Sequence, residues 1–229
     1  GGRYAYANQP PVLQWNLARF AETLIPLVDP DQDEAVRLLT EVLATFPDEY
    51  QRAWTAGMRR KIGLPDRDDD EVTRLIDELS RLLSASRADF TLFFRALTDA
   101  AAGWADADAD PDTGSGSTAP SGSALDPSAP TIDPTAGVRD LVGHLADDSV
   151  ARWRGLRPSA PVMAAANPVY IPRNNLVDEA LDAATAGNLG PFNELVAVVT
   201  DPYTPRPGLD RYARPAPPGS GRHVTYCGT

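Results

Sequence analysis

Cysteine, histidine and long apolar runs are scarce in this chain of 229 residues. The single cysteine, Cys227, excludes an intrachain disulfide and is typical of a protein from a reducing compartment. Two histidines and one cysteine provide too few ligands for a zinc site built by the protein alone. No stretch approaches the roughly 18 consecutive apolar residues of a transmembrane helix. We therefore expect a cytoplasmic protein without a membrane span.

Basic side chains are outnumbered by acidic ones. The chain has 21 Lys and Arg against 32 Asp and Glu, a formal net charge of −11. Because binding to a phosphate backbone requires a basic surface, no nucleic-acid partner is expected. An anionic membrane surface is excluded as a partner for the same reason. What the chain does contain is apolar residues at helical spacing, which predicts a mainly α-helical protein.

The first residues have an unusual pattern. Tyr4 and Tyr6 alternate with small residues, so they fall on one side of an extended segment. Pro10 and Pro11 follow, and proline suits the first turn of a helix. Such a specific segment is typical of the interior of a fold. We therefore expect the chain to start inside a larger fold, with its function divided across that point.

Apolar residues spaced three and four apart predict paired helices joined by short turns. The expected helices are 12–28, 32–45, 47–62, one from the acidic run 66–71 to Ser84 or Ser86, and 89–102. In the first helix, Leu13, Leu17, Phe20, Leu24 and Leu27 form one continuous apolar face. The third helix ends in Arg59-Arg60-Lys61, either a solvated end matched to the helix dipole or a contact for an acidic partner or a phosphate.

The composition divides the chain into four parts. Residues 1–102 form the first helical part, and residues 103–136 are rich in Ala, Asp, Ser, Gly and Pro, which predicts a disordered insert. Helical spacing returns at 137–200, with expected helices over 138–153, after Asn175 and up to Val199. The prolines of 201–229 forbid a regular helix and predict an extended tail docked on the helices.

Several separated runs together resemble one family. They are Gly2-Arg3-Tyr4-Ala5-Tyr6, Asn8-Gln9-Pro10, Trp15-Asn16-Leu17-Ala18-Arg19, Met58-Arg59 with Lys61 and Gly63-Leu64, Asn167-Pro168, Arg173-Asn174, Asp201-Pro202, Arg211-Tyr212 and Cys227. In this order they are similar to the C-terminal portion of the selenoprotein O family, and they extend over nearly the whole chain. The insert at 103–136 departs from the shorter bacterial pattern of that family.

The resemblance implies a mainly α fold: the helical C-terminal part of a protein-kinase-like fold plus a C-terminal extension. Family members transfer AMP from ATP to hydroxyls of protein substrates with magnesium. Their Lys–Glu pair, phosphate-binding arginines and metal-ligating Asn and Asp precede the Gly-Arg-Tyr run. The resemblance therefore implies that ATP and Mg²⁺ are bound upstream, that this chain holds no catalytic, nucleotide-binding or metal-binding residue, and that it is inactive alone.

Two sets of residues remain candidates for a role near the chemistry. By the resemblance, Arg3, Tyr4, Tyr6 and Asn8 either line the edge of the active site or only pack their segment onto the helices. Cys227 occupies the family's selenocysteine or cysteine position, third from the end. It is either a redox residue that pairs with a cysteine outside this chain or an inert thiol. A different function class, a non-enzymatic helical interaction module or degenerate gene remnant, also stays open.

Overall fold

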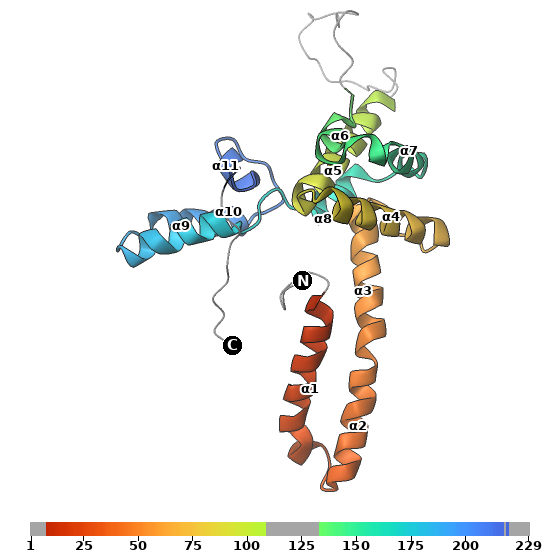
Figure 1. Ribbon diagram of the computed structural model, residues 1–229, viewed down its shortest axis with the longest axis vertical. Helices are drawn as coiled ribbons and strands as arrows, with labels where there is room; N and C mark the ends of the chain where they lie inside the picture. The colour runs from red at the N-terminus through yellow and green to blue at the C-terminus, as the bar shows by residue number, and fades with distance from the viewer. Residues whose placement is uncertain (1–7, 109–132, 218, 220–229) are drawn as a thin grey trace, which may run out of the picture. The chain divides into compact units, whose positions relative to one another are not determined.

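The computed structural model describes residues 8–108, 133–217 and 219 (Figure 1). The chain divides into two compact units, Gly1–Met58 and Arg59–Thr229. Every regular element over the described residues is a helix, so the predicted mainly α class is confirmed. Within the same ranges no helix is both long and apolar enough to cross a membrane. The kinase-like arrangement stays a prediction.

The first unit is a pair of helices followed by the start of a third. They are α1 (Gln9–Val28), α2 (Gln32–Ala44) and α3 (Phe46–Lys61), and α3 ends in the second unit. Pro10 and Pro11 lie in the first turn of α1, where their missing N–H groups leave no helical bond unmade. α1 and α2 pack side by side (Figure 1), with Ala21 and Ala35 buried.

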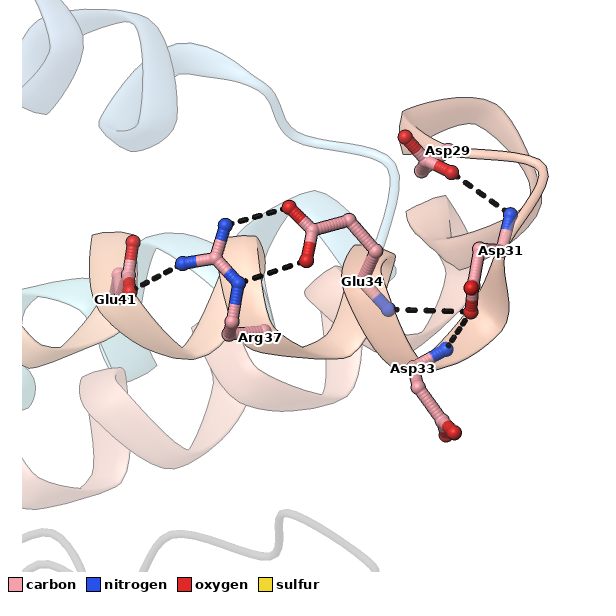
Figure 2. Close-up of polar contacts among 6 residues, drawn as sticks. All are labelled: Asp29, Asp31, Asp33, Glu34, Arg37 and Glu41. Carbon is pink, nitrogen blue, oxygen red and sulfur yellow. Dashed lines mark hydrogen bonds and ion pairs between the residues drawn. The ribbon is translucent and has the colours of Figure 1, made fainter.

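Carboxylates organise the turn between α1 and α2 (Figure 2). The Asp29 Oδ1 atom accepts a hydrogen bond of 2.8 Å from the Asp31 N–H, and Asp31 in turn caps α2. The Asp31 Oδ1 atom accepts from the N–H of Asp33 at 2.9 Å. One turn later Arg37 pairs with both Glu34 and Glu41. Asp31 thus satisfies two of the N–H groups that α2 itself leaves without partners, those of Asp33 and Glu34.

The second unit contains the larger core. Its elements are α4 (Asp70–Ser86), α5 (Phe90–Asp108), α6 (Ala136–Val142), the 3-10 helix η2 (Gly143–Ala146), α7 (Asp147–Gly155), α8 (Ala160–Ala166), α9 (Asn174–Thr185), α10 (Gly190–Val199) and α11 (Asp210–Ala213). α4 packs against α6 and α7, and α5 against α6 and α8. α4 buries Val72, Leu75, Ile76, Leu79 and Leu83, which recur at helical spacing along one face.

Some predicted boundaries were wrong. α5 continues past Ala102 to Asp108, into the predicted insert, because Trp104 is buried and its ring lies 5.3 Å from that of Trp153. Residues 109–132 of that insert lie outside the described residues. The single helix predicted over 138–153 is broken into α6, η2 and α7, because Gly143 takes a left-handed φ of 67°.

A second, smaller core joins α9, α10 and α11. Its buried residues are Tyr170, Leu176, Ala180, Leu195, Val198 and Tyr212. α9 and α10 pack against each other as a helical hairpin (Figure 1), which the spacing of their apolar residues predicts. The short α11 interrupts the proline-rich segment after Pro202, and its Tyr212 brings that segment onto the hairpin.

Candidate functional site

The described part of the predicted active-site edge is Asn8. It is exposed at the N-terminal end of α1 and borders a cavity of about 360 Å³ whose other lining residues are Pro11, Val12 and Trp15. Arg3, Tyr4 and Tyr6 lie outside the described residues, as does Cys227. Their roles therefore stay predictions.

Two of the runs that carried the resemblance, the one that contains Lys61 and the one that contains Asn167, meet at the C-terminal end of α3. Asn167, which is buried, donates from Nδ2 to the Lys61 carbonyl at 2.8 Å and to the Thr98 hydroxyl at 3.0 Å. Its Oδ1 accepts from the Lys61 Nζ at 3.2 Å. A buried amide needs such partners, because an unsatisfied polar group costs free energy. Asn167 thereby ties α5 and the end of α8 to the end of α3.

Lys61, the only lysine in the sequence, points into this joint. Its Nζ also donates to the Ala166 carbonyl at 3.3 Å and lies 5.4 and 5.3 Å from the ring centres of Phe90 and Phe94. Burial lowers the pKa of its ammonium group, since desolvation disfavours the charged form. The ring faces and carbonyl oxygens offset part of that penalty.

Of the two alternatives for the cationic end of α3, the prediction of a solvated end is therefore wrong for two of its three residues. Lys61 is half-buried as described, and the Arg59 side chain is only 15% exposed, with its guanidinium 2.7 Å from Asp68. Arg59 also donates to the Arg67 carbonyl at 3.1 Å. Arg59 thus holds the turn that follows α3, and Lys61 holds the end of α8, so both cations have structural tasks.

Gly63 allows the closest backbone approach in this joint. Its φ is 73°, and its carbonyl accepts from the Ser159 N–H at 2.9 Å. A Cβ at this position would lie 2.8 Å from the Ser159 nitrogen and 2.9 Å from the Met163 Cγ. Next to it, the Trp153 Nε1 donates to the Ile62 carbonyl at 2.8 Å. Only glycine fits here, because it combines positive φ with no side chain.

A second joint connects the segment after α10 to the helices. Arg173, buried at the start of α9, donates to an Asp89 carboxylate oxygen at 2.7 Å and to the Ala213 carbonyl at 3.3 Å. Asp89 also accepts from the Leu92 N–H at 2.9 Å, which caps α5. Burial opposes ionisation of Asp89, but the bonds from Arg173 and the backbone outweigh it and lower the pKa of this carboxyl.

The remaining motif residues continue the same joint. The Pro202 carbonyl accepts from the N–H groups of Val169 and Tyr170, at 2.7 and 3.1 Å. The Tyr170 hydroxyl accepts from the Arg206 N–H at 2.8 Å, and the Arg206 guanidinium lies 5.3 Å from the Tyr170 ring centre. Thus the Asn-Pro, Arg-Asn and Asp-Pro runs are packing joints of the second unit.

Two further cavities flank Trp104. They have volumes of about 420 and 880 Å³, and Arg154 lines both, with its guanidinium 5.1 Å from the centre of a Trp104 ring. The carboxylates of the smaller cavity, Asp133 and Asp147, are both paired with Arg139. No group of three or more His, Cys, Asp or Glu side chains in the described ranges could hold a metal ion.

Comparison with known proteins identifies the class. The chain is 46% identical over 229 residues to a protein of Mycolicibacterium paratuberculosis, 42% over 235 residues to one of Pseudarthrobacter chlorophenolicus, and 42% over 232 residues to one of Chromobacterium violaceum. Each alignment covers all of this chain but only 42%, 42% and 44% of the relative. All three relatives are named protein nucleotidyltransferase YdiU.

A match to a family model identifies the family of the chain. The model of the family described as protein adenylyltransferase SelO matches residues 1–200, most of this chain. The chain therefore belongs to the SelO family of protein adenylyltransferases, and the resemblance seen in its sequence is confirmed. It spans about 42% of the length of the first curated relatives it matches.

Proposed function

We propose that this chain is the C-terminal helical portion of a protein adenylyltransferase with a kinase-like fold. The complete enzyme transfers AMP from ATP, with Mg²⁺, to the hydroxyl of Ser, Thr or Tyr in a protein substrate. The hydroxyl oxygen bonds to the α-phosphorus and pyrophosphate leaves. The observation that carries this proposal is the alignment of the whole chain with less than half of each protein nucleotidyltransferase.

The groups that bind ATP and Mg²⁺ belong, in this proposal, to the part of the family that the chain does not match. Phosphoryl chemistry requires cations and metal-bound carboxylates around the transferred group. The chain alone is then inactive.

Within the complete enzyme, we assign supporting roles to the residues named from the sequence. Arg3, Tyr4, Tyr6 and Asn8 hold the edge of the active site, and the position of Asn8 beside a cavity at the start of α1 is consistent with this. Cys227 forms a reversible disulfide with a cysteine outside this chain. Equal activity of a complete enzyme and its Cys227→Ser variant, in both oxidising and reducing buffer, would refute the redox role.

The test of the transfer reaction uses two labels. The chain alone and the full-length Mycolicibacterium paratuberculosis relative are incubated with Mg²⁺, candidate proteins and ATP labelled at either the α- or the γ-phosphate. Label from the α-phosphate alone is expected on Ser, Thr or Tyr, and only with the full-length protein. Label from the γ-phosphate would indicate a kinase instead. If neither label transfers, the non-enzymatic interaction module becomes the better hypothesis.

A further inference from the structure

Helix α1 is apolar on more sides than its partner α2 can cover. Between Gln9 and Val28 the only charged side chains are Arg19 and Glu22, and these pair with each other at 2.6 Å. Of its residues only Ala21 is buried. A helix that is apolar around most of its circumference is normally buried within a larger body.

Three of the exposed apolar residues of α1 lie on one line along the helix. Leu13, Phe20 and Leu27 are 47%, 60% and 81% exposed, and we name them the apolar stripe. Because they are seven residues apart, each lies within about 20° of the preceding one around the helix axis. At 1.5 Å per residue, the stripe is about 21 Å long. Large exposed apolar patches of this kind mark interaction sites.

A second copy of this chain is a poor candidate to cover the stripe, because two copies would each carry a net charge of −11 and repel each other. The longer relatives offer another candidate. α1 lies inside the region matched by the family model, and the first relatives contain more than half of their length outside the match with this chain. In those relatives the residues aligned with α1 are part of a longer polypeptide.

We infer that the apolar stripe is an interface with the part of the polypeptide that the longer family members have and this chain does not match. The complementary surface is aliphatic or aromatic and poor in charged residues at its centre. The inference rests on family membership and relative length. It does not rest on the proposed transfer of AMP, because its readout is stability.

The test compares the same substitutions in two contexts. Phe20→Glu and Leu27→Glu are made together in this chain, and Glu is placed at the aligned positions of the full-length Mycolicibacterium paratuberculosis relative. In this chain the stripe is exposed, so the melting temperature should change by less than about 2 °C. In the longer protein it should fall by about 5 °C or more, because two charges are forced into an apolar interface.

Arg19→Glu is the matched control, since it adds negative charge to the same helix away from the stripe, and surface charges contribute little. It should leave both proteins within about 2 °C of the parent. Equal shifts in the two contexts for the stripe variant would overturn the inference. So would a dimer of this chain in light scattering that the stripe variant converts to a monomer, because the occupant would then be a second copy.

Discussion

Substitution of Gly63 by alanine tests the joint at the end of α3. Alanine at a φ of 73° costs about 1–2 kcal/mol of backbone strain. Its Cβ would also meet the Ser159 nitrogen at 2.8 Å and the Met163 Cγ at 2.9 Å. The Met163 side chain can change its rotamer, whereas the Ser159 backbone is held by its hydrogen bond to the Gly63 carbonyl. Such overpacking costs a further amount of about 1–3 kcal/mol.

The matched control is Gly187, which follows α9. Its φ is 87°, but a Cβ there would have no heavy atom within 4 Å. Gly187→Ala therefore carries only the strain, about 1–2 kcal/mol. At about 2–4 °C per kcal/mol, Gly63→Ala should lower the melting temperature by about 4–20 °C and Gly187→Ala by about 2–8 °C. Far-ultraviolet circular dichroism measures the loss of helix on heating in this mainly helical chain.

Asparagine separates strain from contact, because it tolerates the left-handed region better than alanine does. Gly187→Asn should be nearly neutral, whereas Gly63→Asn should remain strongly destabilising. If the alanine variants at the two positions shift the melting temperature equally, the close approach to Ser159 is not a constraint and the reasoning fails.

Three further predictions concern polar side chains of the second unit. Asn167→Ala should lower the free energy of unfolding by about 1–3 kcal/mol in chemical denaturation, because the partly buried Lys61 carbonyl and the buried Thr98 hydroxyl each lose a partner. An unchanged midpoint would contradict this. The pKa of Asp89 is lowered from 3.8, so its contribution to the free energy of unfolding is complete above that pH and is lost as the pH falls through the folded-state pKa. Asp89→Asn should remove this part of the acid dependence of stability. A variant as acid-sensitive as the parent would refute this prediction. The Lys61 amine should titrate with a pKa below 10.5 in NMR of the reductively methylated chain. The free energy of unfolding should therefore rise as the pH passes from that lower pKa toward 10.5. A pKa of 10.5 or more would refute the burial of the amine.

The helices that bury one clear face could be predicted from the sequence. The apolar face of α4 is buried, because its apolar residues repeat at helical spacing and its other face is charged. In α1 the spacing likewise predicts one apolar face, yet Leu27 on that face is 81% exposed. Periodicity indicates that a face is apolar, but what covers the face depends on neighbours that the pattern does not contain.

The joints could be predicted only in part. Asp89 precedes an apolar helical run, which is the pattern of a helix cap, so its position was accessible to sequence reasoning. Its pairing with Arg173, 84 positions away in the chain, was not. Thr98 gave no signal, because a threonine within a helix is ordinary until Asn167 donates to it. Long-range polar contacts of this kind are fixed by the packing of helices and not by local pattern.

The solitary lysine makes the end of α3 a natural reporter for protein chemistry. Of the 21 basic side chains, Lys61 alone is an amine, so a lysine-specific protease has one cleavage site in the whole sequence. That site lies three positions beyond Met58, where the chain divides into its two compact units. Because the amine is enclosed by two phenyl rings and Asn167, cleavage requires local opening of this joint. The rate at which one band becomes two on a gel therefore measures how often the joint opens.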